Sequence, residues 1–111
     1  MITSVAQFSM KADQVDRALA LVAAVEQEAA AAQPGTVVYL AHRVVDQDGV
    51  PTLGLLFYES YIDQAAVQVH LNSRSWQTLV TNWPLCFEGT TASIQLRPVE
   101  RIAGFVRLPT G

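Results

Sequence analysis

His70 is the residue in this chain whose type and position most readily suggest acid–base chemistry. It follows Ala66 by four positions, so the two side chains share one face of a helix predicted over residues 61–72. The small Ala66 and the neighbouring Val67 and Val69 indicate that this face points toward the core. An imidazole there can accept a proton near neutral pH or hold an anion through a hydrogen bond. On the residues alone, a core histidine bonded to a backbone carbonyl is the simpler interpretation.

Two other residues that could do chemistry, His42 and Cys86, have structural explanations. His42 falls at an even position of a strand predicted over residues 36–45, on the side away from the helices. Cys86 is the only cysteine, so it can form neither an intramolecular disulfide nor a thiolate metal cluster. His42 and His70 are the only histidines and no HxxE or HExxH spacing exists, so we expect no metal site. A Gly-rich phosphate loop, which is typical of nucleotide and flavin binding, is also missing from the sequence.

Glu59 and Asn72 are the remaining polar candidates. Glu59 shares a strand face with Phe57, and a buried carboxylate needs a partner, for which Arg43 on the paired strand is the candidate. We interpret Glu59 and Arg43 as an ion pair that sets the strand register. Asn72 could orient a substrate oxygen, although its place at the end of a predicted helix also suits a cap.

The elements that must position these residues follow from hydrophobic periodicity and from helix breakers. Strands are predicted at Ile2–Ser9, Thr36–Val45, Thr52–Ser60 and Thr90–Arg97, with Val99–Phe105 as a further edge strand. Helices are predicted from an N-cap at Asp13 to Gln33, over Tyr61–Asn72, and from a cap at Ser73 through Arg74–Trp83, closed by Pro84. The first helix ends at Gln33-Pro34-Gly35, because proline cannot continue a helix and glycine permits a sharp exit.

The resulting order, β-α-β-β-α-α-β, predicts an α+β two-layer sandwich of the ferredoxin-like kind, an antiparallel sheet with helices on one face. We expect one domain over residues 1–111, with a core of about 1–98 and a terminal strand or tail at 99–111. The second face of the sheet is also apolar. It would carry Val38, Leu40, Val44, Leu56 and Tyr58. A homodimer covering this face would bury on the order of 2,000 Å² or more.

Composition narrows the class of protein further. Of the 111 residues, 50% are hydrophobic and 15% charged, which excludes intrinsic disorder. The net charge is −3 and the seven basic residues are scattered, so we expect no nucleic-acid partner. The N-terminus has no basic start or long apolar run, and Ala18–Ala32 is interrupted by Glu26, Gln27 and Glu28. We therefore expect a cytoplasmic protein with no membrane partner.

Two segments resemble the signature of the antibiotic biosynthesis monooxygenase family. Residues 57–73 read Phe-Tyr-Glu-Ser-Tyr-Ile-Asp-Gln-Ala-Ala-Val-Gln-Val-His-Leu-Asn-Ser. They are similar to a strand ending in an aromatic-Glu-x-aromatic step, followed by a short helix with a His-Leu-x-Ser exit. Residues 33–39, Gln-Pro-Gly-Thr-Val-Val-Tyr, resemble the Pro-Gly-x-x-x-Tyr motif at the start of the family's second strand. The resemblance runs from the first strand to about Trp76 and weakens after Trp83.

The resemblance implies a dimeric α/β barrel, in which two sheets pack face to face with the helices outside. It also implies a small cofactor-independent monooxygenase that oxidises a phenolic, quinol or polyketide-type aromatic, with O2 as co-substrate and no metal or flavin. His70 would then be the catalytic base. Asn72 and several aromatic side chains would bind the small aromatic substrate, because aromatic walls suit a flat ligand. The aromatic residues are Tyr39, Phe57, Tyr61, Trp76 and Trp83.

Two other functions stay open at this point. One is an isomerase or other proton-transfer enzyme that uses the same pocket and His70. The other is a non-catalytic dimeric module for ligand binding or stress response. Since large Trp and Val side chains could fill the pocket, an open cavity beside His70 is the feature that would separate an enzyme from a filled module.

Overall fold

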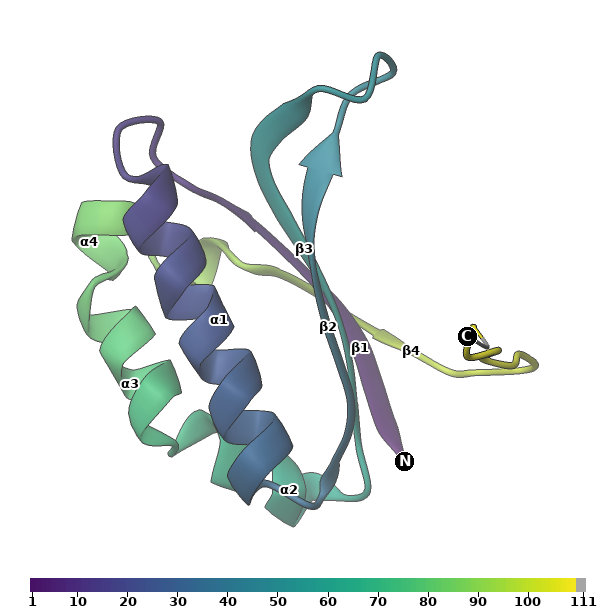
Figure 1. Cartoon of the computed structure of the whole chain (residues 1–111). Helices are drawn as coiled ribbons and strands as arrows, with labels where there is room; N and C mark the ends of the chain where they lie inside the picture. Colours follow the sequence, from purple (N-terminus) through teal and green to yellow (C-terminus); the bar gives the residue numbers. More distant parts are fainter. Residues whose placement is uncertain (110–111) are drawn as a thin grey trace.

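The computed structural model describes residues 1–109, and its main feature is a four-stranded antiparallel sheet with the helices packed on one face (Figure 1). The elements are β1 (Ile2–Ser9), α1 (Val15–Ala32), β2 (Thr36–Val45), β3 (Pro51–Tyr61), α2 (Gln64–Leu71), α3 (Arg74–Thr81), α4 (Trp83–Cys86), a 3-10 helix at Thr91–Ser93, and β4 (Gln95–Val99). The strand order is β2-β3-β1-β4. The predicted ferredoxin-like α+β fold is confirmed.

The strand register decides which side chains face the helices. Phe57 on β3 pairs with Ala41 on β2 and with Ala6 on β1. Phe57 is buried beneath the helices. Val37 is 50% exposed, because the register of β2 shifts between Thr36 and Val38. Tyr39, which follows this shift, lies on the same side as Phe57, with ring centroids 6.0 Å apart.

The core lies between the sheet and α1, α3 and α4. Phe8 stacks on Phe57 with ring centroids 5.0 Å apart and lies 4.7 Å from the ring of Trp83. Helix α1 contributes the apolar face that its periodicity predicted, and the buried members of this face are Ala18, Val22, Val25 and Ala29. Leu79 on α3 completes the layer. This packing fixes the helices over one face of the sheet (Figure 1).

The helix starts agree with the prediction at α3 and differ from it at α1 and α2. Ser73 accepts a hydrogen bond from the backbone N–H of Trp76 and caps α3 as predicted. The prediction of Asp13 as N-cap of α1 is wrong, because Gln14 holds that position without a side-chain bond. Helix α2 begins at Gln64 rather than Tyr61, since the carboxylate of Asp63 accepts from the backbone N–H of Ala66.

The C-terminal third departs most from the predicted elements. Pro84 does not close a helix but lies in the first turn of α4, where its missing N–H costs nothing. The predicted strand Thr90–Arg97 is wrong in its first half, because the side chains of Thr90 and Ser93 form a capping box around a 3-10 turn. The edge strand β4 then includes Pro98. The predicted strand Val99–Phe105 is also wrong, since residues 100–109 form neither strand nor helix.

Gly35 has a different role from the one the sequence indicated. Positive φ angles occur at Gly49, Gly89 and Gly104 but not at Gly35, so the turn itself does not require glycine there. A Cβ at position 35 would lie 2.6 Å from the Cβ of Ala66. The backbone of Gly35 also accepts a hydrogen bond of 2.9 Å from the N–H of Ile62. Glycine therefore lets the start of β2 approach α2, the helix that carries His70.

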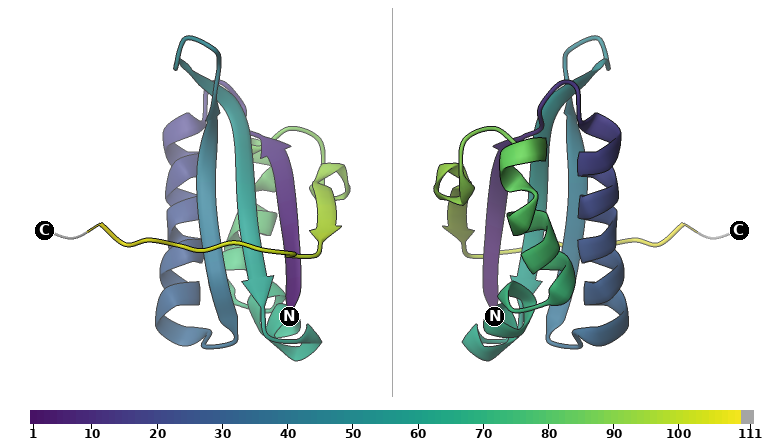
Figure 2. Two further views of the ribbon diagram at one scale, coloured as in Figure 1. Left: turned by 90° about the vertical axis from the view of Figure 1, so that its right-hand side faces the viewer. Right: turned by 90° about the vertical axis from the view of Figure 1, so that its left-hand side faces the viewer.

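The sheet face opposite the helices is left uncovered within residues 1–109. Tyr58 pairs with Val5 on one side and Leu40 on the other, and Leu40 is 52% exposed. The segment 100–109 passes in front of this face in the left view of Figure 2, and Arg101 donates a hydrogen bond to the hydroxyl of Tyr58. Four apolar side chains of this segment are 78–94% exposed: Ile102, Phe105, Val106 and Leu108.

Candidate functional site

A cavity of about 480 Å³ lies between the sheet and helices α2 and α3. Its walls are mostly apolar, and its size is that of sites for small organic ligands. The lining residues are Ile2, Thr3, Ser4, Ala6, Phe8, Tyr39, Phe57, Glu59, Tyr61, Gln64, Val67, His70, Leu71, Trp76, Leu79, Thr91, Ile94, Leu96 and Pro98. The pocket predicted between the sheet and the helices is therefore open rather than filled.

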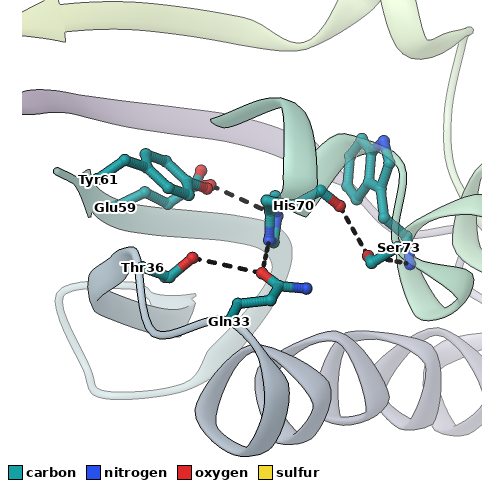
Figure 3. Close-up of polar contacts among 7 residues, drawn as sticks. Gln33, Thr36, Glu59, Tyr61, His70 and Ser73 are labelled. Carbon is teal, nitrogen blue, oxygen red and sulfur yellow. Dashed lines mark hydrogen bonds and ion pairs between the residues drawn. The ribbon is translucent and has the colours of Figure 1, made fainter. Parts of the chain in front are cut away.

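His70 is part of the wall of this cavity and is only 2% exposed (Figure 3). Its ring lies between aromatic side chains, with the centroids of Tyr39, Tyr61 and Trp76 at 5.2, 5.5 and 6.0 Å. Helix α2 places it there because Ala66, one turn earlier, is small enough to pack against Gly35. The alternative of a core histidine bonded to a backbone carbonyl is not what the structure has, since Nδ1 bonds a side chain.

That side chain is Gln33, the residue that follows α1. The amide Oε1 of Gln33 lies 2.9 Å from Nδ1 of His70, and both residues are buried. The hydroxyl of Thr36 donates to the same Oε1 at 3.3 Å. The other ring nitrogen, Nε2, lies 3.9 Å from a carboxylate oxygen of Glu59, which also lines the cavity. One nitrogen of His70 is thus bound to the protein and the other faces the site.

Burial favours the neutral forms of the titratable groups around this histidine. It lowers the pKa of His70, although the negative charge of Glu28 on α1 partly opposes the shift. Burial raises the pKa of Glu59, while a hydrogen bond of 2.5 Å donated by the hydroxyl of Tyr61 acts in the opposite direction. Burial and the nearby Glu59 raise the pKa of both Tyr39 and Tyr61. A neutral imidazole with a free lone pair is the form that can accept a proton.

The expected ion pair between Glu59 and Arg43 is wrong. The guanidinium Nε of Arg43 donates to the backbone carbonyl of Thr52, at 2.7 Å, and Glu59 pairs instead with Tyr61. Strand pairing explains the difference, because Glu59 lies opposite Tyr39 while Arg43 lies opposite Leu55. Glu59 is therefore a cavity group and not a register-setting one.

The structure brings together five of the seven candidate residues. Tyr39, Phe57, Tyr61, His70 and Trp76 all line the cavity. Trp83 lies outside its lining, buried in the core, where its indole N–H donates to the carbonyl of Glu88. Asn72 is exposed and ends α2 as its C-cap. Neither Trp83 nor Asn72 lines the cavity.

Several wall residues were not foreseen from the sequence. Ser4 and Ala6 come from β1, and Ile94, Leu96 and Pro98 come from the edge strand and the turn before it. The sequence could have indicated the β1 residues, because Ala6 lies two positions before Phe8 and therefore on the same face of the strand. Within residues 1–109, no three His, Cys, Asp or Glu side chains gather as metal ligands would. No helix in the same range is long and apolar enough to cross a membrane.

Comparison with known sequences gives one match. The family model described as "Antibiotic biosynthesis monooxygenase" matches residues 1–82, which include every wall residue from β1 through α3. No curated protein matches the chain in sequence. The matched region ends before the 3-10 helix and β4, the part of the chain where the sequence resemblance also weakens.

Solved structures share the fold at low sequence identity. The crystal structure of an antibiotic biosynthesis monooxygenase is 20% identical, with a TM-score of 0.73 over 93% of this chain and 100% of that one. Protein NE2512 of Nitrosomonas europaea, of unknown function, is 20% identical with a TM-score of 0.69 over 99% and 95% of the two chains. Rv0793 from Mycobacterium tuberculosis is 18% identical, with a TM-score of 0.70 over 93% and 96%. These similarities extend the shared fold over nearly the whole chain.

Proposed function

The chain belongs to the antibiotic biosynthesis monooxygenase family, and from that membership and the site geometry we propose that it oxidises a phenolic, quinol or polyketide-type aromatic with O2. The observation that carries the proposal is the placement of His70. A neutral imidazole stands in the wall of an open, mostly apolar cavity, and its Nε2 is on the cavity side. The aromatic walls suit a flat substrate, and the cavity size matches a small one.

The proposed chemistry needs a base and a dry aromatic slot from the protein. Nε2 of His70 takes the phenolic proton, and the resulting aryl oxide is electron-rich enough to pass an electron to O2. Recombination at a ring carbon forms a C–O bond, and the imidazolium returns its proton to the distal oxygen. Loss of the ring C–H proton then breaks the O–O bond, giving a quinone and water. The substrate supplies all of the electrons, so a phenol and O2 balance a quinone and H2O.

The remaining cavity groups have roles that follow from their positions. Tyr39, Phe57 and Trp76 present ring surfaces to the substrate, which favours offset stacking. Glu59, whose carboxyl is held toward its neutral form by burial, can donate a hydrogen bond to a second substrate oxygen, such as that of a quinol. A substrate with one oxygen at His70 and another at Glu59 would be oriented by both, because Nε2 and the Glu59 oxygen are 3.9 Å apart.

The test is oxygen consumption by the purified protein with hydroquinones, anthrones and simple phenols. We expect saturable consumption with at least one of these classes, and one labelled oxygen atom in the product when ¹⁸O2 is supplied. If no member of the three classes gives consumption above the rate without protein, the proposal is wrong. Tight binding of the same compounds without turnover would favour a ligand-binding module instead.

We also propose that the protein works as a homodimer joined through the uncovered sheet face, as a dimeric α/β barrel. Support comes from Leu40 and Tyr58 on that face and from the exposed apolar side chains of the segment 100–109. This segment starts at the uncovered face, where Arg101 contacts Tyr58, and extends past β2 (Figure 2). A second copy seated on the sheet would cover both the face and the segment, which water otherwise solvates unfavourably.

A further inference from the structure

We propose that Gln33 is a positioning residue that fixes the tautomer of His70, holding the proton on Nδ1 and leaving the lone pair of Nε2 directed to the cavity. The inference rests on the proposed function for its consequence, but the tautomer itself can be measured without a substrate. It concerns a residue outside the cavity lining that acts on the site through a single buried hydrogen bond.

Both the backbone and the side chain of Gln33 are held by hydrogen bonds. Its backbone N–H donates to the carbonyl of Ala29, and its backbone carbonyl accepts from the N–H of Thr36. The side chain is 4% exposed and reaches His70 at 2.9 Å (Figure 3). The residue is therefore held at both its backbone and its side chain, in the turn between α1 and β2. A side chain held in this way has little freedom to follow a rotating imidazole.

The orientation of the amide decides which ring nitrogen is protonated. With Oε1 toward His70, the carbonyl can only accept, so Nδ1 must carry the hydrogen. The hydroxyl of Thr36 donates to the same oxygen. This orientation leaves the amide Nε2 of Gln33 without a hydrogen-bond partner among residues 1–109, a cost that is set against the two contacts made by Oε1. In the reversed orientation the amide nitrogen would donate to Nδ1, and the hydrogen of His70 would sit on Nε2, where it would block proton transfer from a substrate.

The groups that face His70 from each element agree with a neutral, Nδ1-protonated ring. Glu59 and Tyr61 on β3, Tyr39 on β2 and Glu28 on α1 are the titratable residues around it. Tyr61 directs its hydroxyl hydrogen to Glu59 and not to His70. Burial lowers the pKa of His70 and raises that of Glu59. Gln33 is thus the neutral partner whose hydrogen bond selects between two neutral tautomers.

A consequence for turnover follows. After Nε2 accepts a proton, the imidazolium keeps its Nδ1–H bond to Gln33, so no rearrangement is needed during the reaction. A chain lacking this acceptor would distribute the proton between Nδ1 and Nε2. Only the molecules with a free Nε2 lone pair could act as the base.

The experiment is ¹⁵N-detected NMR of the imidazole nitrogens, on the wild-type chain and on Gln33→Met and Gln33→Glu. Exposed Gln27 on α1 supplies the matched controls Gln27→Met and Gln27→Glu. In the wild type above pH 7, we expect the protonated shift at Nδ1 and the unprotonated shift at Nε2. Gln33→Met should give a mixture of tautomers. Gln33→Glu should keep Nδ1–H and raise the pKa of His70 by about one unit or more, because a carboxylate replaces a neutral acceptor.

The wild-type spectrum alone can overturn the proposal, even if Gln33→Met fails to fold. A hydrogen on Nε2 in the wild type, or an unchanged tautomer in folded Gln33→Met, would do so. With an oxidised substrate in hand, Gln33→Met should lower kcat at similar KM, in proportion to the fraction of His70 that the spectrum shows protonated on Nε2, since a base in the wrong tautomer adds little to the rate. An Nδ1-protonated His70 in a protein that oxidises none of the aromatics would support the tautomer assignment while removing the proposed function.

Discussion

Replacing Gly35 by alanine should destabilise the protein through one contact, and the size of the effect can be worked out. The new Cβ would lie 2.6 Å from the Cβ of Ala66 and 3.4 Å from Cγ1 of Ile62. Overpacking of this kind costs about 1–3 kcal/mol, and the reduced freedom of the unfolded chain returns about 0.4–1 kcal/mol. The net loss, at most about 2.6 kcal/mol, should lower the melting temperature by about 4–8 °C for each kcal/mol.

A double-mutant cycle with Ala66→Gly tests the cause of that loss. Ala66→Gly alone costs about 1 kcal/mol of helix propensity in α2. If the clash is responsible, Gly35→Ala in the Ala66→Gly background should keep only the gain of about 0.4–1 kcal/mol from the unfolded chain, so the coupling free energy should equal the overpacking cost of about 1–3 kcal/mol. Gly49→Ala is the matched control, because Gly49 has a positive φ and nothing within 4 Å of a built Cβ. Its cost should be the same with either residue at 66. Additive losses for Gly35→Ala and Ala66→Gly would refute the explanation.

Three further predictions concern the assembly, the titration of His70 and the substrate wall. Sedimentation velocity at micromolar concentration should show a dimer, which Leu40→Glu on the uncovered face weakens and Leu85→Glu on α4 does not; a monomeric wild type would contradict the proposed assembly. Because burial lowers the pKa of folded His70 below its usual 6.5, the unfolded state takes up the proton first, and stability should fall as pH falls from 6.5 toward the folded pKa. In urea titrations, the free energy of unfolding of His70→Gln should lack this pH-dependent contribution. A pH dependence identical to that of the wild type would contradict the prediction. Trp76→Ala should raise KM for an aromatic substrate by about 2- to 10-fold, because an aromatic pair contributes ~0.5–1.5 kcal/mol to binding. An unchanged KM would show that Trp76 is not part of the binding wall.

The sequence was sufficient for the elements whose patterns are local. The apolar face of α1 and the cap at Ser73 depend on spacing along one segment, and the structure has both. The C-terminal strands were predicted less well, because the side chains of Thr90 and Ser93 bind nearby backbone and form a turn where alternation indicated a strand. The predicted strands stop at Arg97 and resume at Val99, on either side of Pro98, whereas β4 continues through this proline because an edge strand has an unpaired side that tolerates it.

In the candidate site too, the sequence revealed spacing within one helix but not contacts between residues far apart in the chain. His70 could be singled out from its spacing to Ala66 on one helix face. Its partner Gln33 lies 37 residues away in sequence and is brought to it by the turn after α1. Periodicity cannot reveal such a contact, since it does not show which polar residue at or near the end of α1 reaches His70. The pairing of Arg43 with Glu59 failed for the same reason, because a long side chain can select among several acceptors near its strand.

The assignment of His70 as the base is tested most directly by comparing the oxygen-consumption rate and the melting temperature of His70→Ala with those of the wild type. With a hydroquinone or anthrone that the wild type oxidises, we expect the rate of the variant to fall by about 10²-fold or more, the scale of a positioned general base. Helix α2 should remain folded, because alanine is a good helix former. A variant that melts early but turns over at a normal rate per folded molecule would contradict the assignment and leave His70 with a structural role only.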